Sequence, residues 1–246
     1  PEDLPFFLGF MDHLASRGIH APVPIKGRDG EALRSLCGRP AAVVTFLDGM
    51  WHRRIKPEHC SQLGEALAKM HLAGLDFSLN RVNNLSVTAW RGLLSDSLAR
   101  ADEVKEGLAE ELEAELTLLE NQWPEGLPSG IIHGDLFPDN VFFQGDKLSG
   151  LIDFYFACND CFAYEIAICL DAWCFEPDGS FNATKARRLL TAYRSVRDFS
   201  PRELEALPLL ARGSSMRFLL TRLYDWLNTP ANALVTPKDP LEFLKR

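Results

Sequence analysis

Three polar side chains near the middle of the chain have the types and the spacing to hold a metal ion and to activate a hydroxyl group. Asp135 and Asn140 lie in Ile-Ile-His-Gly-Asp-Leu-Phe-Pro-Asp-Asn, and Asp153 follows in Ile-Asp-Phe. A carboxylate on a tight loop can accept a proton from an attacking hydroxyl group. An amide and a second carboxylate supply the oxygen ligands that Mg²⁺ prefers. The pattern therefore predicts phosphoryl transfer, with Asp135 as the base and Asn140 and Asp153 as magnesium ligands.

Each of these residues also has a purely structural interpretation. Asp135 could cap a loop, Asn140 could close an Asx turn, and Asp153 could be a solvated acid at the end of a strand. Their joint occurrence between paired β segments favours the chemical interpretation. We interpret His133 as a structural residue that holds the loop by packing and hydrogen bonding, and Asp139 as a solvated neighbour.

Short β segments and amphipathic helices are expected to position this loop. Alternation and turn residues predict strands at 130–132, 141–143 and 148–152, and a buried β-branched strand at 41–47 preceded by a partner segment at 34–40. Apolar residues at helical spacing predict helices at 2–17, 59–73, 98–120, 163–173, 184–193 and 201–227, the last one broken near Gly213. The 163–173 helix is apolar on nearly all sides, so it is expected at the centre of a domain.

Composition narrows the class of protein. The 246 residues are 46% hydrophobic and 24% charged, as in an ordinary globular protein of one or two domains. The formal net charge of −8 argues against nucleic acid as a partner. No segment reads as a leader peptide or a membrane span, so we expect a cytoplasmic protein. Cys158 and Cys161 form an isolated C-x-x-C, for which free thiols are favoured over a zinc or redox site.

The catalytic pattern resembles a known set of motifs. H-G-D-x-x-x-x-N followed by I-D-F is similar to the protein-kinase set H-R-D-x-x-x-x-N and D-F-G, with Gly134 in place of the arginine. This variant resembles the aminoglycoside phosphotransferase-like kinases, which act on small molecules. The stretch Leu-Gly-x-x-Leu-Ala-x-Met-His71 is similar to a helix of that family, whose histidine packs near the catalytic loop. Residues 41–49 resemble its strand and hinge, where the backbone at Phe46 and Leu47 would bind the adenine edge.

The resemblance implies an α+β, protein-kinase-like fold that uses ATP and Mg²⁺. Residues 1–49 would be a remnant of the small nucleotide-binding lobe with the hinge, and residues 50–246 a mostly helical catalytic and substrate-binding lobe with short β-hairpins. The glycine-rich loop of the small lobe and its strand lysine are not found. We therefore expect the chain to be an incomplete kinase, with a glycine-containing hairpin and a strand lysine within roughly 80 residues upstream.

Two longer stretches, 148–175 and 212–226, resemble the members of the family that phosphorylate the hydroxyl group of L-homoserine in threonine biosynthesis. Such a substrate requires a forked cation for its carboxylate. Arg217 is the candidate, although a structural ion pair of Arg217 with an acidic neighbour is equally open; the neighbours in question are Asp171, Glu165 and Asp225. Asn159, with Asp160 and Asp171, is a candidate for the ammonium group. Tyr155 is a candidate pocket wall, and Trp173 is more simply explained by core packing.

The sequence also allows other interpretations of the acceptor and of the function. Glu165 stands where many relatives have an aspartate, so a structural acid is displaced by one methylene group. The acceptor could be a different alcohol, such as an aminoglycoside, choline or a sugar. The chain could also be a binding module that has lost catalysis, a reading suggested by the missing lysine. The intact set of Asp135, Asn140 and Asp153 argues against the module.

Overall fold

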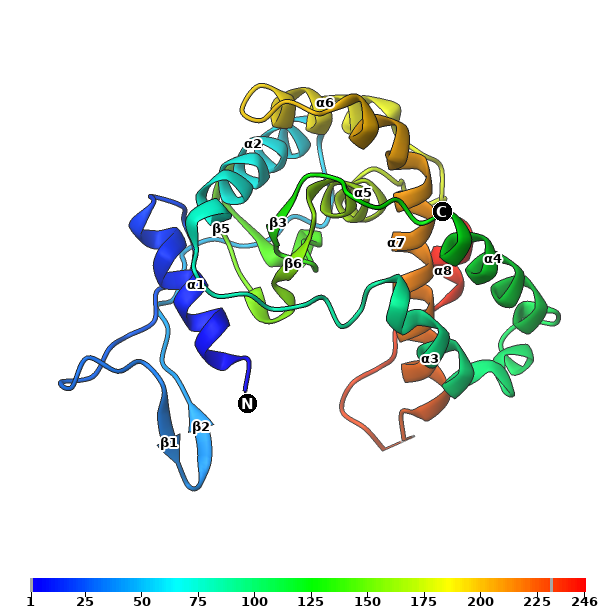
Figure 1. Ribbon diagram of the computed structural model, residues 1–246, viewed down its shortest axis with the longest axis horizontal. Coiled ribbons are helices and arrows are strands. Elements are labelled where there is room, and N and C mark those ends of the chain that lie inside the picture. Colours follow the sequence, from blue (N-terminus) through cyan, green and yellow to red (C-terminus); the bar gives the residue numbers. More distant parts are fainter. Residues whose placement is uncertain (1, 231) are drawn as a thin grey trace.

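The computed structural model describes residues 2–230 and 232–246, which form a mostly helical body and three two-stranded antiparallel sheets (Figure 1). The helices are α1 (Leu4–Ser16), α2 (Pro57–Ala73), α3 (Val87–Leu98), α4 (Leu108–Gln122), α5 (Phe162–Trp173), α6 (Ala183–Arg194), α7 (Pro201–Asn228) and α8 (Leu241–Leu244). The sheets pair β1 (Arg34–Leu36) with β2 (Arg39–Ala41), β3 (Ser129–Ile132) with β6 (Cys158–Cys161), and β4 (Val141–Gln144) with β5 (Lys147–Leu151). This is the mostly helical α+β architecture that the sequence predicts.

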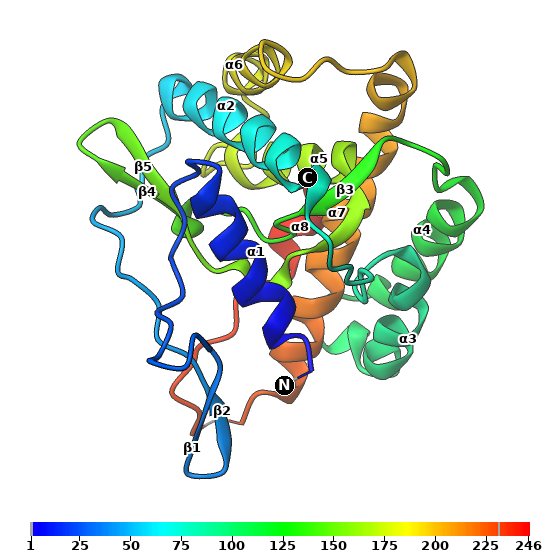
Figure 2. The same cartoon turned by 60° about the vertical axis from the view of Figure 1, so that its left-hand side comes forward.

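The apolar helix α5 lies at the centre of the molecule, as its sequence predicts. Ten of its residues are buried, from Phe162 to Trp173, and the helix packs against α6, α7 and strand β3. The long helix α7 runs along one side of it, and α2 and α6 lie together on another (Figure 1). Helix α1 packs on the outside against the 3₁₀ turns η1 (Gly74–Asp76) and η4 (Phe154–Phe156) (Figure 2). None of the helices among the described residues combines the length and apolar character that a membrane span requires.

The helix expected over 98–120 is instead interrupted, so this prediction was wrong. Helix α3 ends at Leu98, and α4 begins only at Leu108, after a 3₁₀ turn, η2 (Ala101–Glu103). Gly107 adopts a left-handed φ of 76°, which a helix interior does not allow. The Asp102 carboxylate accepts a hydrogen bond from the amide of Ala109 at 2.9 Å and so binds one of the free amides in the first turn of α4.

The break expected near Gly213 does not occur, because α7 continues through this residue. The glycine is needed for close packing instead. A Cβ atom at position 213 would lie 2.2 Å from the ring of Trp123. Gly213, which suggested a break in the helix, therefore marks the place where the aromatic side chain of Trp123 approaches the helix backbone.

The predicted buried strand at 41–47 is also wrong. Ala41 ends the strand β2, and among the described residues the rest of the segment forms backbone hydrogen bonds with a short stretch at 23–25, where Thr45 N donates to Val23 O at 2.9 Å. Val43 is 67% exposed and Phe46 is 83% exposed. Within the described residues no apolar layer packs over this segment, so its β-branched sequence alone does not bury it. The predicted partner segment forms the hairpin β1–β2, which projects from the helical body in Figures 1 and 2.

Strand β6 was not expected, because its sequence Cys-Asn-Asp-Cys is polar. It becomes a strand by pairing with β3, where Asn159 lies opposite Ile131. The C-x-x-C motif therefore brackets a strand. Both thiols are free, and burial raises the pKa of Cys158 and of Cys161 to about 12.

Helix packing gives a stability prediction. A Cβ atom at Gly64 in α2 would lie 2.2 Å from the backbone oxygen of Leu189 in α6, so Gly64→Ala must push the two helices apart. We expect a loss of about 1–3 kcal/mol in the free energy of unfolding, measured by urea denaturation.

The matched control is Gly92→Ala in α3, where no atom lies within 4 Å of the added Cβ. This change should be neutral or stabilising by up to about 1 kcal/mol, because alanine favours a helix over glycine. Equal effects of the two substitutions would contradict the proposed close approach of α2 and α6.

Candidate active site

The β4–β5 hairpin brings the three candidate chemical residues to one place. The loop from His133 to Asn140 leaves β3 and ends in the 3₁₀ turn η3 (Pro138–Asn140), which leads into β4. Strand β5 then returns toward the loop. The amide of Ile152 donates to the carbonyl oxygen of Asn140 at 3.0 Å, and Nε2 of His133 donates to the carbonyl oxygen of Ile152 at 2.8 Å. Asp153, directly after these contacts, therefore lies beside the loop that carries Asp135.

The start of the loop is held by the carboxylate of Glu165, a fully buried residue of α5. Its Oε2 accepts a hydrogen bond from the amide of His133 at 2.8 Å, and its Oε1 accepts one from the amide of Gly134 at 2.7 Å. A third donor, Nε2 of His71 in α2, lies 2.9 Å from Oε2. One carboxylate therefore joins the loop to two helices.

The protonation states of this cluster follow from its contacts. Burial lowers the pKa of His71 despite the neighbouring Glu165, so the imidazole is neutral. Its Nδ1 accepts from the hydroxyl group of Tyr193 at 2.8 Å, which leaves the proton on Nε2 for Glu165. Burial alone would raise the pKa of Glu165, but the hydrogen bonds from His71 and from the backbone of His133 outweigh it, and the pKa is lowered. Glu165 is therefore an ionised anchor.

Gly134 is held at both of its backbone groups. Its φ of 77° is in the left-handed region, and a Cβ atom there would lie 2.9 Å from the carbonyl oxygen of Phe156. Its amide donates to Glu165, and its carbonyl oxygen accepts from Nη1 of Arg217 at 2.5 Å. The structure thus gives a physical reason for glycine at the position where protein kinases carry an arginine.

Asp135 and Asn140 contact each other directly. The Nδ2 group of Asn140 donates to the carbonyl oxygen of Asp135 at 2.7 Å and to its carboxylate Oδ2 at 3.2 Å. Burial raises the pKa of Asp135 above the ordinary aspartate range, against the lowering effect of His133 and Arg217. A carboxylate with a raised pKa is a stronger base, which suits proton abstraction from a hydroxyl group.

The donor set fits a hard divalent cation. Because both contacts to Asp135 come from Nδ2 of Asn140, its amide oxygen Oδ1 is left for another partner. Asp153 is exposed at the end of β5, with a left-handed φ of 64°. An amide oxygen and a carboxylate are suitable ligands for such an ion, which completes its shell with phosphate oxygens and water.

Arg217 of α7 lies beneath the loop and is only 3% exposed. Its guanidinium group lies over the ring of Phe218 at 4.6 Å and near that of Phe156 at 5.9 Å. Within the described residues it forms no ion pair, so the expected alternative of a structural pair is not found. The Nε atom is buried and has no hydrogen-bond partner there. A buried cation therefore lies near Asp135, with no carboxylate within ion-pair distance among the described residues.

The other candidate substrate residues are more engaged in structure. Asn159 closes a contact with the 77–86 loop, because its Oδ1 accepts from the amide of Arg81 at 2.8 Å. Tyr155 is 50% exposed and packs edge-on against Phe7 at 5.6 Å. Trp173 is buried and donates from Nε1 to the carbonyl oxygen of Leu136 at 2.8 Å, as expected of a core residue.

The segment after Phe46 and Leu47 packs onto the β4–β5 hairpin, which ends two residues before Asp153. Ser149 Oγ donates to the carbonyl oxygen of Asp48 at 2.8 Å, and Met50 exchanges two backbone hydrogen bonds with Phe143, both 3.0 Å long. The expected hinge therefore contacts the two strands, β4 and β5, that lie between the expected metal ligands in the sequence.

The sequence does not reveal that Glu165 anchors the 133–140 loop. It indicates this residue only as a departure from an aspartate and as a possible ion-pair partner of Arg217. The signal that could have identified it is a single acidic residue in an otherwise apolar central helix, because a charge in that setting requires several donors.

The candidate base and the two candidate oxygen ligands lie on a loop and a hairpin that a helical lobe supports, an arrangement that fits a phosphotransferase of the protein-kinase-like fold class. The model of the phosphotransferase enzyme family matches residues 1–199, and the chain belongs to that family. The expected resemblance to the aminoglycoside phosphotransferase-like kinases is thereby confirmed.

Curated relatives cover the whole chain. A homoserine kinase of Paramagnetospirillum magneticum is 62% identical over 252 residues, which span 100% of this chain and 77% of that protein. A homoserine kinase of Rhodospirillum rubrum is 63% identical over 243 residues, which span 99% of this chain and 76% of that protein. The similarity thus extends well beyond the catalytic loop.

Solved structures share the fold at low identity. The amicoumacin kinase hAmiN has a TM-score of 0.68 at 16% identity, covering 95% of this chain and 73% of that one. The spectinomycin phosphotransferase APH(9)-Ia has a TM-score of 0.66 at 13% identity, covering 99% of this chain and 78% of that one. The predicted fold class is therefore correct.

The Glu165 cluster gives a second stability prediction. Glu165→Gln keeps the shape but turns one acceptor oxygen into an NH₂ group that faces a donor. We expect a loss of about 2–4 kcal/mol in the free energy of unfolding at pH 7, measured by urea denaturation. Glu110→Gln on the exposed face of α4 is the control and should change little.

At acidic pH, the difference in the free energy of unfolding between the wild type and Glu165→Gln should become smaller. Because the pKa of Glu165 is lowered in the folded protein, its contribution is complete above the ordinary glutamate range and is lost as the pH falls through the folded-state value. A gap between wild type and Glu165→Gln that stays constant down to strongly acidic pH would show that Glu165 is not an ionised anchor.

Proposed function

We propose that the chain transfers the γ-phosphoryl group of ATP to the hydroxyl group of L-homoserine and forms O-phospho-L-homoserine. The observation that carries this proposal is the identity of 59–63% with homoserine kinases of several bacteria over 99–100% of the chain. Solved kinases for aminoglycosides, choline and ethanolamine share only 15–23% identity, which supports the fold and not their acceptors.

In the proposed reaction Asp135 is the base. The acceptor oxygen attacks the γ-phosphorus, the bond to the oxygen that bridges the β- and γ-phosphorus breaks, and ADP leaves. The acceptor proton passes to the carboxylate of Asp135, whose position is fixed by Asn140. Mg²⁺, held by Asn140 Oδ1 and Asp153, would neutralise charge on the phosphates when bound.

Arg217 is proposed to bind the substrate carboxylate. Its support is the combination of deep burial, an unpaired Nε atom and a position beside the catalytic loop. An unpaired buried cation is unfavourable, and an entering carboxylate would relieve that cost. Tyr155 and Asn159 are retained as candidates for the wall and the polar end of the same pocket. His133 and His71 support the site through Ile152 and Glu165.

We further assign residues 1–49 to the remnant of the small nucleotide-binding lobe with the hinge, and residues 50–246 to the catalytic lobe. The crossing of the chain onto β4 at Met50 supports this division. The backbone groups of Phe46 and Leu47 are proposed to bind the adenine edge, and they have no backbone partner among the described residues.

Acceptor choice is tested by an assay of ADP release with the full-length protein. L-Homoserine should be used with a kcat/KM at least about 100-fold above that of L-serine, choline, kanamycin and glucose. L-Serine is the sharpest comparison, because it lacks one methylene group. Turnover of another acceptor without turnover of L-homoserine would overturn the proposal.

The two carboxylates should behave differently when they are changed. Asp135→Asn should lower kcat by about 10²–10⁴-fold and leave ATP affinity nearly unchanged, because a base acts in the transition state. Asp153→Asn should lower kcat and also weaken binding of ATP with Mg²⁺, measured by calorimetry.

Asp139→Asn is the control, since Asp139 is exposed on the same loop. It should keep most of the activity. If Asp135→Asn and Asp153→Asn weakened nucleotide binding equally, the division of roles between base and metal ligand would be wrong.

A further inference from the structure

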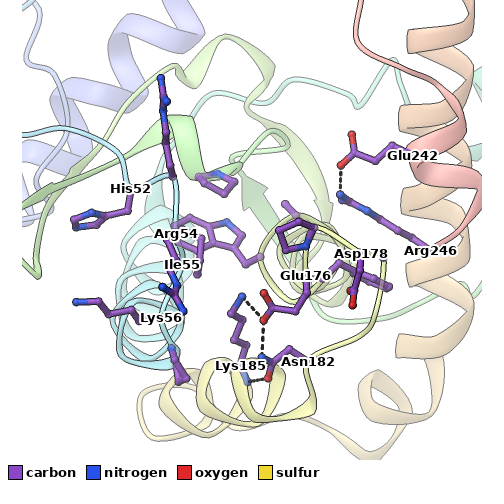
Figure 3. A pocket seen from close by; sticks show the side chains of 18 of the residues that line it. His52, Arg54, Ile55, Lys56, Glu176, Asp178, Asn182, Lys185, Glu242 and Arg246 are labelled. Carbon is purple, nitrogen blue, oxygen red and sulfur yellow. Dashed lines mark hydrogen bonds and ion pairs between the residues drawn. The ribbon is translucent and has the colours of Figure 1, made fainter.

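A cavity of about 960 Å³ lies outside the candidate catalytic centre. It is open to solvent on one side and is bordered by the linker at 51–56, the end of α5 with the 175–179 loop, the start of α6, and the C-terminal residues (Figure 3). Asp135, Asn140 and Asp153 do not line it, although Pro138 of the same loop does. The volume is in the range of small-molecule sites in proteins.

The wall of this cavity carries an excess of positive charge, in a chain whose net charge is −8. Four acidic residues line it, against six cationic ones, which are Arg53, Arg54, Lys56, Lys185, Lys245 and Arg246. Two of the acids are already neutralised. Glu176 pairs with Lys185 at 2.7 Å, and Glu242 pairs with Arg246 and with Arg222.

Among the charged wall residues that form no ion pair within the described part of the chain, three are cations and two, Asp178 and Asp239, are acids, so the cations are in excess. Arg53, Arg54 and Lys245 form no ion pair within the described part of the chain, whereas Lys56 is bound to Asp146 at 2.9 Å. Two guanidinium groups and an ammonium group together favour a multivalent anion over a single carboxylate, because forked donors match phosphate oxygens.

Two helices begin at the cavity and add to its positive potential. Pro57 opens α2, Asn182 caps α6, and both residues line the wall. The two helices run side by side in the same direction, since Gly64 lies against Leu189 and, further along both helices, His71 contacts Tyr193. The side chain of Asn182 already accepts hydrogen bonds from two backbone amides of α6. This helix therefore contributes the positive potential of its dipole more than free amide donors.

The cavity is also joined to the catalytic loop. Trp173 lines it and donates a hydrogen bond to the carbonyl oxygen of Leu136, the residue after Asp135. Pro138, another wall residue, begins the turn that carries Asn140. A ligand in the cavity would therefore contact Trp173 and Pro138, which hold the loop on the side away from Asp135 and Asn140.

We propose that this cavity binds a small phosphate-bearing anion, separately from the catalytic centre, and that the bound anion alters the catalytic loop through Trp173 and Pro138. The site is defined by its shape and charge and does not depend on which acceptor the enzyme phosphorylates. Its occupant could be inorganic phosphate or the phosphate monoester of an amino acid, and the two share the chemistry that the wall recognises.

Calorimetric titration of the full-length protein in a buffer without phosphate separates these two sources. Inorganic phosphate is one probe and O-phospho-L-serine is the other; the tighter of the two identifies the source. The double variant Arg53→Ala/Arg54→Ala should weaken binding at least about tenfold, as expected for loss of two charge-assisted contacts. Arg187→Ala removes an exposed arginine of α6 that does not line the cavity, and it should bind as the wild type does.

Hydrogen exchange of the amides at 133–140 tests the link to the loop. Saturating probe should slow this exchange in the wild type and in Arg187→Ala, but not in the double variant. Thermal unfolding checks that the double variant is folded, which its exposed positions favour. Equal binding by wild type and double variant, absence of saturable binding of both probes, or unchanged exchange would each overturn the proposal.

Discussion

The candidate active site depends on the hydrogen bonds that the buried carboxylate of Glu165 accepts. A charge in the interior is costly unless donors surround it, and here they come from α2 and from the first two residues of the catalytic loop. The loop, α2 and α5 must therefore be in place together. The extra methylene group relative to an aspartate does not displace the anchor, because both carboxylate oxygens reach their donors. Such a shared constraint preorganises a site at the level of backbone atoms.

Glu165 and Arg217 are opposite charges on two packed helices, yet they do not pair with each other. Each instead binds one backbone group of Gly134, so the loop lies between them. A direct ion pair would have satisfied both charges within the helical core and left the loop unattached. The arrangement keeps the guanidinium group of Arg217 only partly satisfied, which is the property that the proposed carboxylate binding requires.

Local features of the sequence predicted the strand β3 and the β4–β5 hairpin correctly, because turn residues and alternation act within a few positions. Contacts between distant residues were harder to predict. Strand β6 forms because it pairs with β3. The 41–47 segment is exposed because, among the described residues, no apolar layer packs over it. The partners His71 and Glu165 are 94 positions apart, so spacing could not join them. Resemblance to known kinases placed His71 near the loop, but the carboxylate between them emerged only from the structure.

The two aspartates differ in setting in a way that suits the proposed division of labour. Asp135 is partly buried, and burial raises its pKa, which increases its strength as a base. Asp153 is exposed on the turn after β5, where solvent and a cation can share its charge. Asn140 distinguishes them further, since its NH₂ group donates to Asp135 and its oxygen is left for the proposed metal ion. One amide that contacts the proposed base and leaves its oxygen for the proposed metal ion can thus help to assign the two carboxylates different roles, as burial does in other enzymes that work with paired acids.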